Sequence, residues 1–291
     1  VVSQSCTVSG VEANYVMTEN PINVDPVMTD PFGTTLNFDT DYTVTLDGEP
    51  VEALPISIST TGSHTLVFTG KGSYVGTKSV ETYLINSING TGSDTDPYII
   101  SNTDEWNTFA YFVNSGTNTY SGEYVKLTAD ISVTEMVGTS ESNSFQGTFL
   151  GDSVHTLTFT KGTSESAFGE ENCAPFRYVK NATIRDLKVA GYIYTSRKLA
   201  AGLVSRPYGT TNITNCQVST VIYSSVNGDS AHGGIVAMPS GTLNFAGCVY
   251  TGHLLTNNES INCGGFMGWY NNATVSVTNS LYIPSGSIAE G

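Results

Sequence analysis

Four segments of this chain repeat one pattern at intervals of 29, 32 and 32 residues, and this repeat limits the folds that the chain can adopt. The segments align on one apolar position, filled by Ile184, Ile213, Phe245 and Val277. Two residues after each stands a residue type that enters the left-handed backbone region at low cost. These residues are Asp186, Asn215, Gly247 and Asn279. The pattern therefore predicts a sharp bend that recurs in every copy.

Apolar and polar residues alternate on both sides of this bend, as they do in strands with one buried face. A strand–bend–strand unit cannot bury its apolar face alone, whereas stacked copies form a continuous core. Parallel coiling is the simplest way to stack them. The repeat therefore predicts a parallel β-helix of about five coils, with its clearest part from about residue 140 to residue 283.

Cys216 and Cys248 are predicted to occupy equivalent inward positions of adjacent coils. A disulfide or a metal pair is the functional interpretation, and a ladder of buried thiols that act as small apolar side chains is the favoured one. The chain has five cysteines, an odd number that is poor evidence for a disulfide framework, and none forms a C-x-x-C pair. We expect no metal site and no cofactor.

One helix is predicted before the repeats, over residues 103–115. Asn102 or Thr103 can cap its start, and Gly116 can end it in a left-handed conformation. An apolar stripe follows at helical spacing: Trp106, Phe109, Ala110 and Val113. A short helix with one apolar face is suited to cap the open end of a β array.

Residues 10–86 carry short β-prone runs between turn clusters, which predict an immunoglobulin-like β-sandwich. The runs are TLNF (35–38), YTVTL (42–46), ISIS (56–59), HTLVFTG (64–70) and SVETYLI (79–85). A polar, glycine-rich joint follows at residues 89–98. We therefore expect two domains, 1–88 and 89–291, in an all-β protein with one N-terminal capping α-helix before the β-helix.

Three phrases of the repeat are similar to the GLUG-type repeat of bacterial surface proteins: AAGLVSRPYGTTNITNCQV (200–218), HGGIVAMPSGTLNFAGCVYTG (232–252) and CGGFMGWYNNATVSVTNSL (263–281). Residues 90–116 resemble the usual lead-in to such arrays. Residues 64–85 resemble the last strands of bacterial surface immunoglobulin-like repeats, with Ser73 where many of these carry Asn. The resemblance implies a right-handed parallel β-helix on secreted or cell-wall proteins, with no catalytic residues to carry over.

The charge balance excludes several classes of partner. Eleven basic residues stand against 26 acidic ones, for a net charge of −15, which repels nucleic acid and anionic lipid. No apolar run reaches the 18 or more residues that suggest a transmembrane segment. We expect an extracellular protein, secreted or on a bacterial cell surface, whose leader is not present in this numbering. We also expect a monomer.

Polysaccharide lyases and glycoside hydrolases are the enzymatic alternative, because many β-helices act on polysaccharides. A calcium-dependent lyase needs stacked acids beside a base, and Arg185, Asp186 and Lys188 offer this mixture on one coil only. The positions stacked on Asp186 are Asn215 and Gly247, so no acid cluster forms. We therefore predict no catalytic residues, with loop-borne acids as the alternative route to such an enzyme.

Aromatic side chains supply the candidate binding residues. If Val189, Gly191 and Ile193 share one face of a strand, Tyr192 and Tyr194 share the other, and Tyr223 lies in line with Tyr194 on the next coil. A second candidate pair lies in the loop of the last coil: Trp269 and Tyr270.

Tyrosine offers a flat apolar face with a polar tip, which suits sugar rings or a protein surface. The alternative is that Tyr simply favours strands. We predict a non-catalytic, adhesin-like binding or display module for glycan or a host or partner protein, with a passive spacer as a further alternative.

Overall fold

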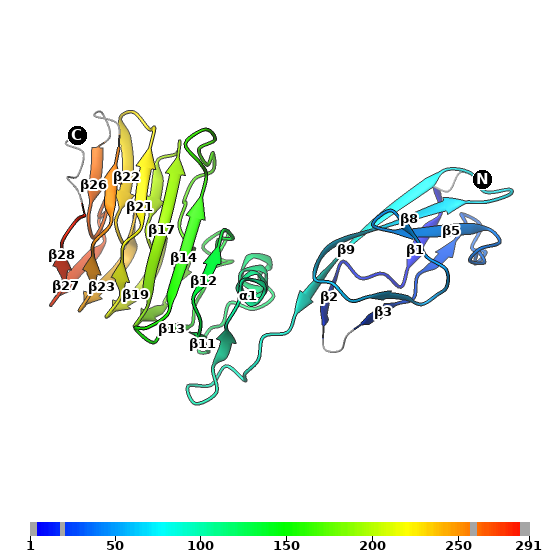
Figure 1. The fold of residues 1–291 in the computed structure, drawn as a ribbon, viewed down its shortest axis with the longest axis horizontal. Helices are drawn as coiled ribbons and strands as arrows, with labels where there is room; N and C mark the ends of the chain where they lie inside the picture. The colour runs from blue at the N-terminus through cyan, green and yellow to red at the C-terminus, as the bar shows by residue number, and fades with distance from the viewer. Residues whose placement is uncertain (1–4, 18–20, 257–260, 286–291) are drawn as a thin grey trace. The chain divides into compact units, whose positions relative to one another are not determined.

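The computed structural model describes residues 5–17, 21–256 and 261–285. The chain divides into two compact units, Val1–Ser87 and Ile88–Gly291, one residue before the expected boundary. Figure 1 colours the first unit from blue to cyan and the second from cyan to red. In the described part of the chain, no helix has both the length and the apolar character needed to cross a bilayer.

The first unit consists of seven strands of two to five residues and two longer ones, β8 with nine and β9 with ten. They are β1 (Thr7–Ser9), β2 (Asn14–Met17), β3 (Ile22–Val24), β4 (Val27–Thr29), β5 (Tyr42–Leu46), β6 (Glu49–Pro50), β7 (Ile56–Ile58), β8 (Gly62–Gly70) and β9 (Thr77–Asn86). One sheet has the order β2-β9-β8-β5-β6, and β1–β4 and β3–β7 form antiparallel pairs. Strand β8 alternates as expected, with His64, Leu66 and Phe68 buried.

Four of the five predicted runs form strands, namely β5, β7, β8 and β9. The prediction for TLNF was wrong, because residues 35–38 contribute only isolated bridges. The Asp41 carboxylate accepts a hydrogen bond of 2.8 Å from the backbone N–H of Asn37. This local bond competes with a sheet ladder and folds the segment into a turn.

The predicted helix is confirmed as α1 (Thr103–Ser115), at the start of the second unit. The Asn102 side chain accepts a hydrogen bond from the N–H of Glu105, and Gly116 ends the helix with φ of 78°. The apolar stripe is fully buried, and Trp106 packs edge-on against Phe176 of the β region at 5.6 Å. The helix therefore shares one core with the strands that follow.

The second unit is a parallel β-solenoid built from three sheets. Sheet 1 contains β10 (Tyr98–Ile100), β11 (Tyr124–Leu127), β13 (Thr148–Leu150), β15 (Phe176–Lys180), β16 (Thr183–Arg185), β19 (Val204–Thr214), β23 (Ser240–Ala246) and β27 (Thr274–Thr278). Sheet 2 contains β12 (Ile131–Val133), β14 (Thr156–Lys161), β17 (Lys188–Thr195), β20 (Gln217–Val218), β21 (Val221–Ser224), β24 (Val249–Tyr250), β25 (His253–Leu255) and β28 (Leu281–Tyr282). Sheet 3 contains β18 (Leu199–Ala201), β22 (Asp229–Gly233) and β26 (Ile261–Gly264).

The predicted corners lie one above another. The apolar positions pair in parallel register, Ile184 with Ile213, Ile213 with Phe245, and Phe245 with Val277. The corner residues Asp186, Asn215, Gly247 and Asn279 have φ of 58°, 53°, 67° and 48°. All four values lie in the left-handed region, which explains the residue types at this position.

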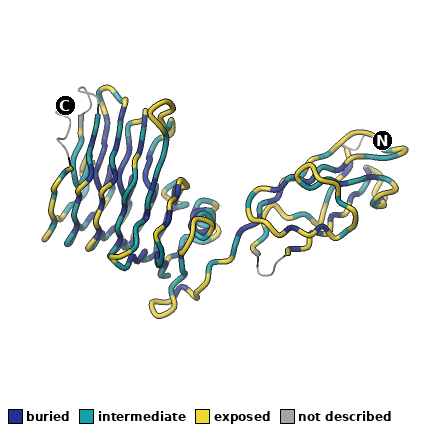
Figure 2. The backbone as a smooth tube through the Cα atoms, viewed as in Figure 1, coloured by how far each residue is buried: buried dark blue, intermediate teal, exposed yellow. Residues whose placement is uncertain are grey.

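The repeat builds the core by stacking buried positions, which Figure 2 shows recurring along the strands of successive coils. Ile184 and Ile213 are completely buried, whereas Val277 of the last aligned segment is 50% exposed. The solenoid makes about 4 turns rather than the expected five.

The thiols lie inside this core. All five cysteines are free, and Cys216 and Cys248 are fully buried. The Cys248 thiol donates to the carbonyl of Ile213 at 3.1 Å. The hydrogen bond with Cys248 and burial raise the pKa of Cys216 well above its ordinary value. The thiol-ladder interpretation therefore agrees with the structure.

Candidate functional site

The predicted tyrosine face lies on the outer side of sheet 2, on strands β17 and β21. Tyr194 pairs with Tyr223 in the parallel register of these strands. Their rings stack with centroids 4.2 Å apart and planes 6° from parallel. Tyr192 stands edge-on to Tyr194, with centroids 5.6 Å apart, and is 41% exposed. The three tyrosines predicted to share this face are therefore brought together, although Tyr194 and Tyr223 are half-buried.

Buried neighbours on β17 fix the direction of these side chains. Val189 and Ile193 point into the core, so the tyrosines between and after them point outward. Gly191 has φ of 113°, and a Cβ atom placed there would lie 2.0 Å from the carbonyl oxygen of Phe159. Only glycine fits this close approach of β17 to β14.

Two grooves flank the stacked rings and share Thr163, Ser164, Tyr194 and Tyr223. The first has a volume of about 300 Å³ and is lined by Thr163, Ser164, Ala167, Tyr194, Thr195, Tyr223, Ser224, Ser225, Leu255 and Thr256. The second has a volume of about 390 Å³ and is lined by Thr163, Ser164, Gly191, Tyr192, Tyr194, Val221 and Tyr223. These lining residues are hydroxyl-bearing or apolar, and none is an acid or a base other than tyrosine.

The loop after β14 forms the wall common to both grooves, and the sequence did not reveal it. The Phe168 backbone N–H donates to the carbonyl of Tyr194 at 2.8 Å, which ties the loop to β17. The stacked rings of Tyr194 and Tyr223 are called the platform below. Within the loop, the Thr163 N–H donates to the Ser166 carbonyl at 2.9 Å. The ammonium of Lys161 lies 5.0 Å from the centre of the Phe168 ring. These contacts hold the hydroxyls of Thr163 and Ser164 beside the tyrosines.

The electrostatics of the face keep Tyr194 uncharged at neutral pH. Burial raises the pKa of Tyr194, and the neighbouring hydroxyl of Tyr223 and the carboxylate of Glu165 raise it further. A hydrogen bond from the Ser164 hydroxyl lowers the pKa of Glu165, so this loop residue carries the nearby negative charge. A neutral ligand therefore meets less repulsion here than an anionic one.

Trp269 and Tyr270, the second predicted pair, follow sheet 3 and do not line either groove. They are 37% and 53% exposed. The ammonium of Lys198 lies 6.0 Å from the centre of the Trp269 ring, and the backbone N–H of Trp269 donates to the carbonyl of Ala237 at 3.0 Å. The predicted site residues thus form two separate surfaces, and both of the grooves described above belong to the tyrosine face.

Asp186 and two acids of a loop before β15, Glu170 and Glu171, have local partners. Asp186 forms an ion pair with Arg185 at 2.8 Å and accepts a hydrogen bond from Asn215. Glu170 pairs with Arg177 at 3.3 Å, and the Glu171 carboxylate accepts a hydrogen bond from the backbone N–H of Leu199. In the part of the chain that the structure describes, no group of three or more His, Cys, Asp or Glu side chains could hold a metal ion.

Known proteins give no further guide to this surface. No protein-family model matches the chain, and neither a curated protein nor a solved structure matches it.

Proposed function

We propose that the solenoid is a non-catalytic module that binds a neutral glycan along the tyrosine face. The observation that carries the proposal is the parallel stack of Tyr194 on Tyr223, with a groove on each side. Aromatic faces pack against the C–H faces of sugar rings, and their hydroxyl groups take part in hydrogen bonds.

The groove walls favour a sugar over a peptide. The hydroxyls of Thr163 and Ser164 bond to the Glu165 carboxylate and keep oxygen lone pairs as acceptors, while the tyrosine hydroxyls supply donors and acceptors for a polyhydroxylated ligand. The uncharged lining and the nearby Glu165 carboxylate favour neutral sugars over acidic ones.

The wider setting is part of the same proposal. We place the chain outside a bacterial cell, as a secreted or surface-bound adhesin-like protein with GLUG-type repeats in a right-handed β-helix. The first unit acts as an immunoglobulin-like module, and α1 acts as the cap of the solenoid. The charge of −15 and the resemblance of the repeat phrases support this setting.

A binding screen on neutral and acidic oligosaccharides, followed by calorimetry on the best ligand, tests the proposal. We expect Tyr194→Ala and Tyr223→Ala each to weaken binding about tenfold or more, which corresponds to about 1.4 kcal/mol. Tyr124→Ala is the matched control, because Tyr124 is a half-buried tyrosine of sheet 1, outside both grooves. The control should bind as the wild type does.

Two outcomes would contradict the proposal. One is the absence of binding to any glycan in the screen. The other is the release of reducing or unsaturated ends from polysaccharides, measured with and without calcium, which would favour a lyase or hydrolase instead.

A further inference from the structure

Buried polar atoms without a hydrogen-bond partner gather on sheet 1, away from the tyrosine face. We call this place the Arg206 corner, and it is distinct from the stacked corner residues described above. Among the described residues, four of the six such atoms lie on β15, on β19 or just before β15. They are Asn172 Oδ1, Arg177 Nε, Ser205 Oγ and Arg206 Nε. Asn172 is 8% exposed and Ser205 is fully buried. Each such atom has lost its hydrogen bonds to water and has gained none within the protein, which is unfavourable.

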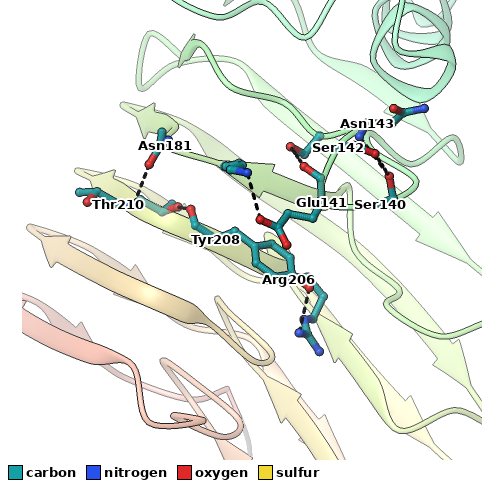
Figure 3. Close-up of polar contacts among 11 residues, drawn as sticks. Ser140, Glu141, Ser142, Asn143, Asn181, Arg206, Tyr208 and Thr210 are labelled. Atoms are coloured by element: carbon teal, nitrogen blue, oxygen red, sulfur yellow. Dashed lines mark hydrogen bonds and ion pairs between the residues drawn. The ribbon is translucent and has the colours of Figure 1, made fainter.

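Two tyrosines frame this corner. Tyr178 pairs with Arg206, and Lys180 pairs with Tyr208, in the parallel register of β15 and β19. The rings of Tyr178 and Tyr208 are within 10° of parallel, with centroids 6.4 Å apart. Arg206 donates from Nη2 to the Tyr208 hydroxyl at 2.9 Å, and its guanidinium lies 5.3 Å from the centre of that ring. Figure 3 shows Arg206 and Tyr208 joined in this way, with Glu141 nearby.

The charges at the corner do not balance. Lys180 forms an ion pair with Glu141 at 3.0 Å, and Arg177 forms one with Glu170 at 3.3 Å. Among the described residues, no carboxylate oxygen lies within 4.0 Å of the Arg206 guanidinium. The chain has 26 acids for 11 bases, so a half-buried arginine without an ion-pair partner is unusual.

We propose that Arg206 binds an oxyanion, the carboxylate or sulfate group of an acidic sugar. Nη2 of Arg206 donates to Tyr208 and Nε is buried, so the remaining N–H groups of the guanidinium are the donors offered to the anion. Lys180, the register neighbour of Tyr208, is already paired with Glu141, so Arg206 carries the uncompensated positive charge. The framing tyrosines supply flat apolar surface for the ring that carries the anion. This site differs from the tyrosine face in position and in ligand charge, and it does not depend on the proposed function.

Calorimetry at low ionic strength on the 291-residue chain tests the site. The probes are a uronic acid oligomer, the neutral oligomer of the same linkage and length, and inorganic sulfate. We expect the uronate or sulfate to bind the wild type. The affinity of the neutral oligomer should be the same for the wild type and the Arg206→Gln variant. Binding of uronate alone identifies a carboxylate ligand, and binding of sulfate alone identifies a sulfate ester. The Arg206→Gln variant should bind at least tenfold more weakly, whereas Arg185→Gln, which alters an exposed arginine paired with Asp186, should bind as the wild type does.

A thermal melt without ligand separates binding from a structural role. Because Arg206 has no acid partner, we expect Arg206→Gln to keep the wild-type Tm or to raise it. Tyr208→Phe, which removes only the hydroxyl that orients Arg206, should weaken oxyanion binding as well. Failure of the wild type to bind either oxyanion would overturn the proposal, and so would undiminished binding by Arg206→Gln or a lower Tm of that variant.

Discussion

Asn215 donates a hydrogen bond of 3.2 Å from Nδ2 to Oδ1 of Asp186, one coil away in the stack. Both residues have φ in the left-handed region, at 53° and 58°. The same side chains thus tolerate the bend and join neighbouring corners. This hydrogen bond makes the stacked corner residues a target for mutation.

Replacing Asn215 with alanine should destabilise the solenoid. Alanine in the left-handed region costs about 1–2 kcal/mol more than a residue suited to it, and the lost hydrogen bond adds about 1 kcal/mol. We expect the free energy of unfolding to fall by about 2–3 kcal/mol in urea titrations. Asn215→Gly is the control, since glycine keeps the backbone conformation, and it should lose less than half as much. Equal losses would show that the backbone conformation is unimportant.

Gly191→Ala should be far more damaging than an ordinary substitution of a glycine with positive φ. The new Cβ would approach the Phe159 carbonyl oxygen to 2.0 Å, so β17 must move away from β14. We expect a loss of more than about 3 kcal/mol in unfolding free energy, together with weaker ligand binding by the displaced tyrosines. Gly122→Ala is the matched control, because φ is 77° and no atom lies within 4 Å of the added Cβ. The unfolding free energy of the control should fall by only about 1 kcal/mol.

Asp152 should make stability depend on pH in the acid range. The backbone N–H of His155 is the main cause that lowers the pKa of Asp152 to about 2, from an ordinary value of 3.8. A pKa that is lower in the folded state adds stability above pH 3.8, and this stability is lost as the pH falls through about 2. The carboxylate is partly exposed, so screening keeps the effect near 1 kcal/mol or below. Urea titrations between pH 2 and 5 should show a smaller pH slope for Asp152→Asn, and an unchanged slope would contradict the assignment.

Thiol reagents should distinguish the cysteines of the folded protein. Cys6, Cys173, Cys216 and Cys248 are buried, whereas Cys263 is partly exposed. Burial raises the pKa of Cys173 to about 12 and raises the pKa of Cys263 too, so access to the reagent decides which thiol reacts first. We expect one thiol to react first under native conditions and the other four only on unfolding. Cys263→Ser should abolish the first phase, and fast labelling of that variant would contradict the buried placement.

The features that the sequence predicted well are those that depend on local pattern. The αL residues at the corners, the Asn102 and Gly116 caps of α1 and the alignment of Tyr194 with Tyr223 each follow from a period or a residue type. The loop that carries Thr163 and Ser164 depends instead on contacts with Tyr194 on the next coil, which no local pattern encodes. The Arg206 corner was missed for a similar reason, because its lack of an acid partner is visible only in three dimensions.

Tyr194 and Tyr223 occupy the same position on successive coils, one strand spacing of about 4.8 Å apart, and Leu255 occupies it on the coil after them. Gene duplication that inserts one more coil would extend the platform by one ring without redesigning a turn or a core position. The number of coils, rather than point mutation, would thus set the length of this aromatic surface.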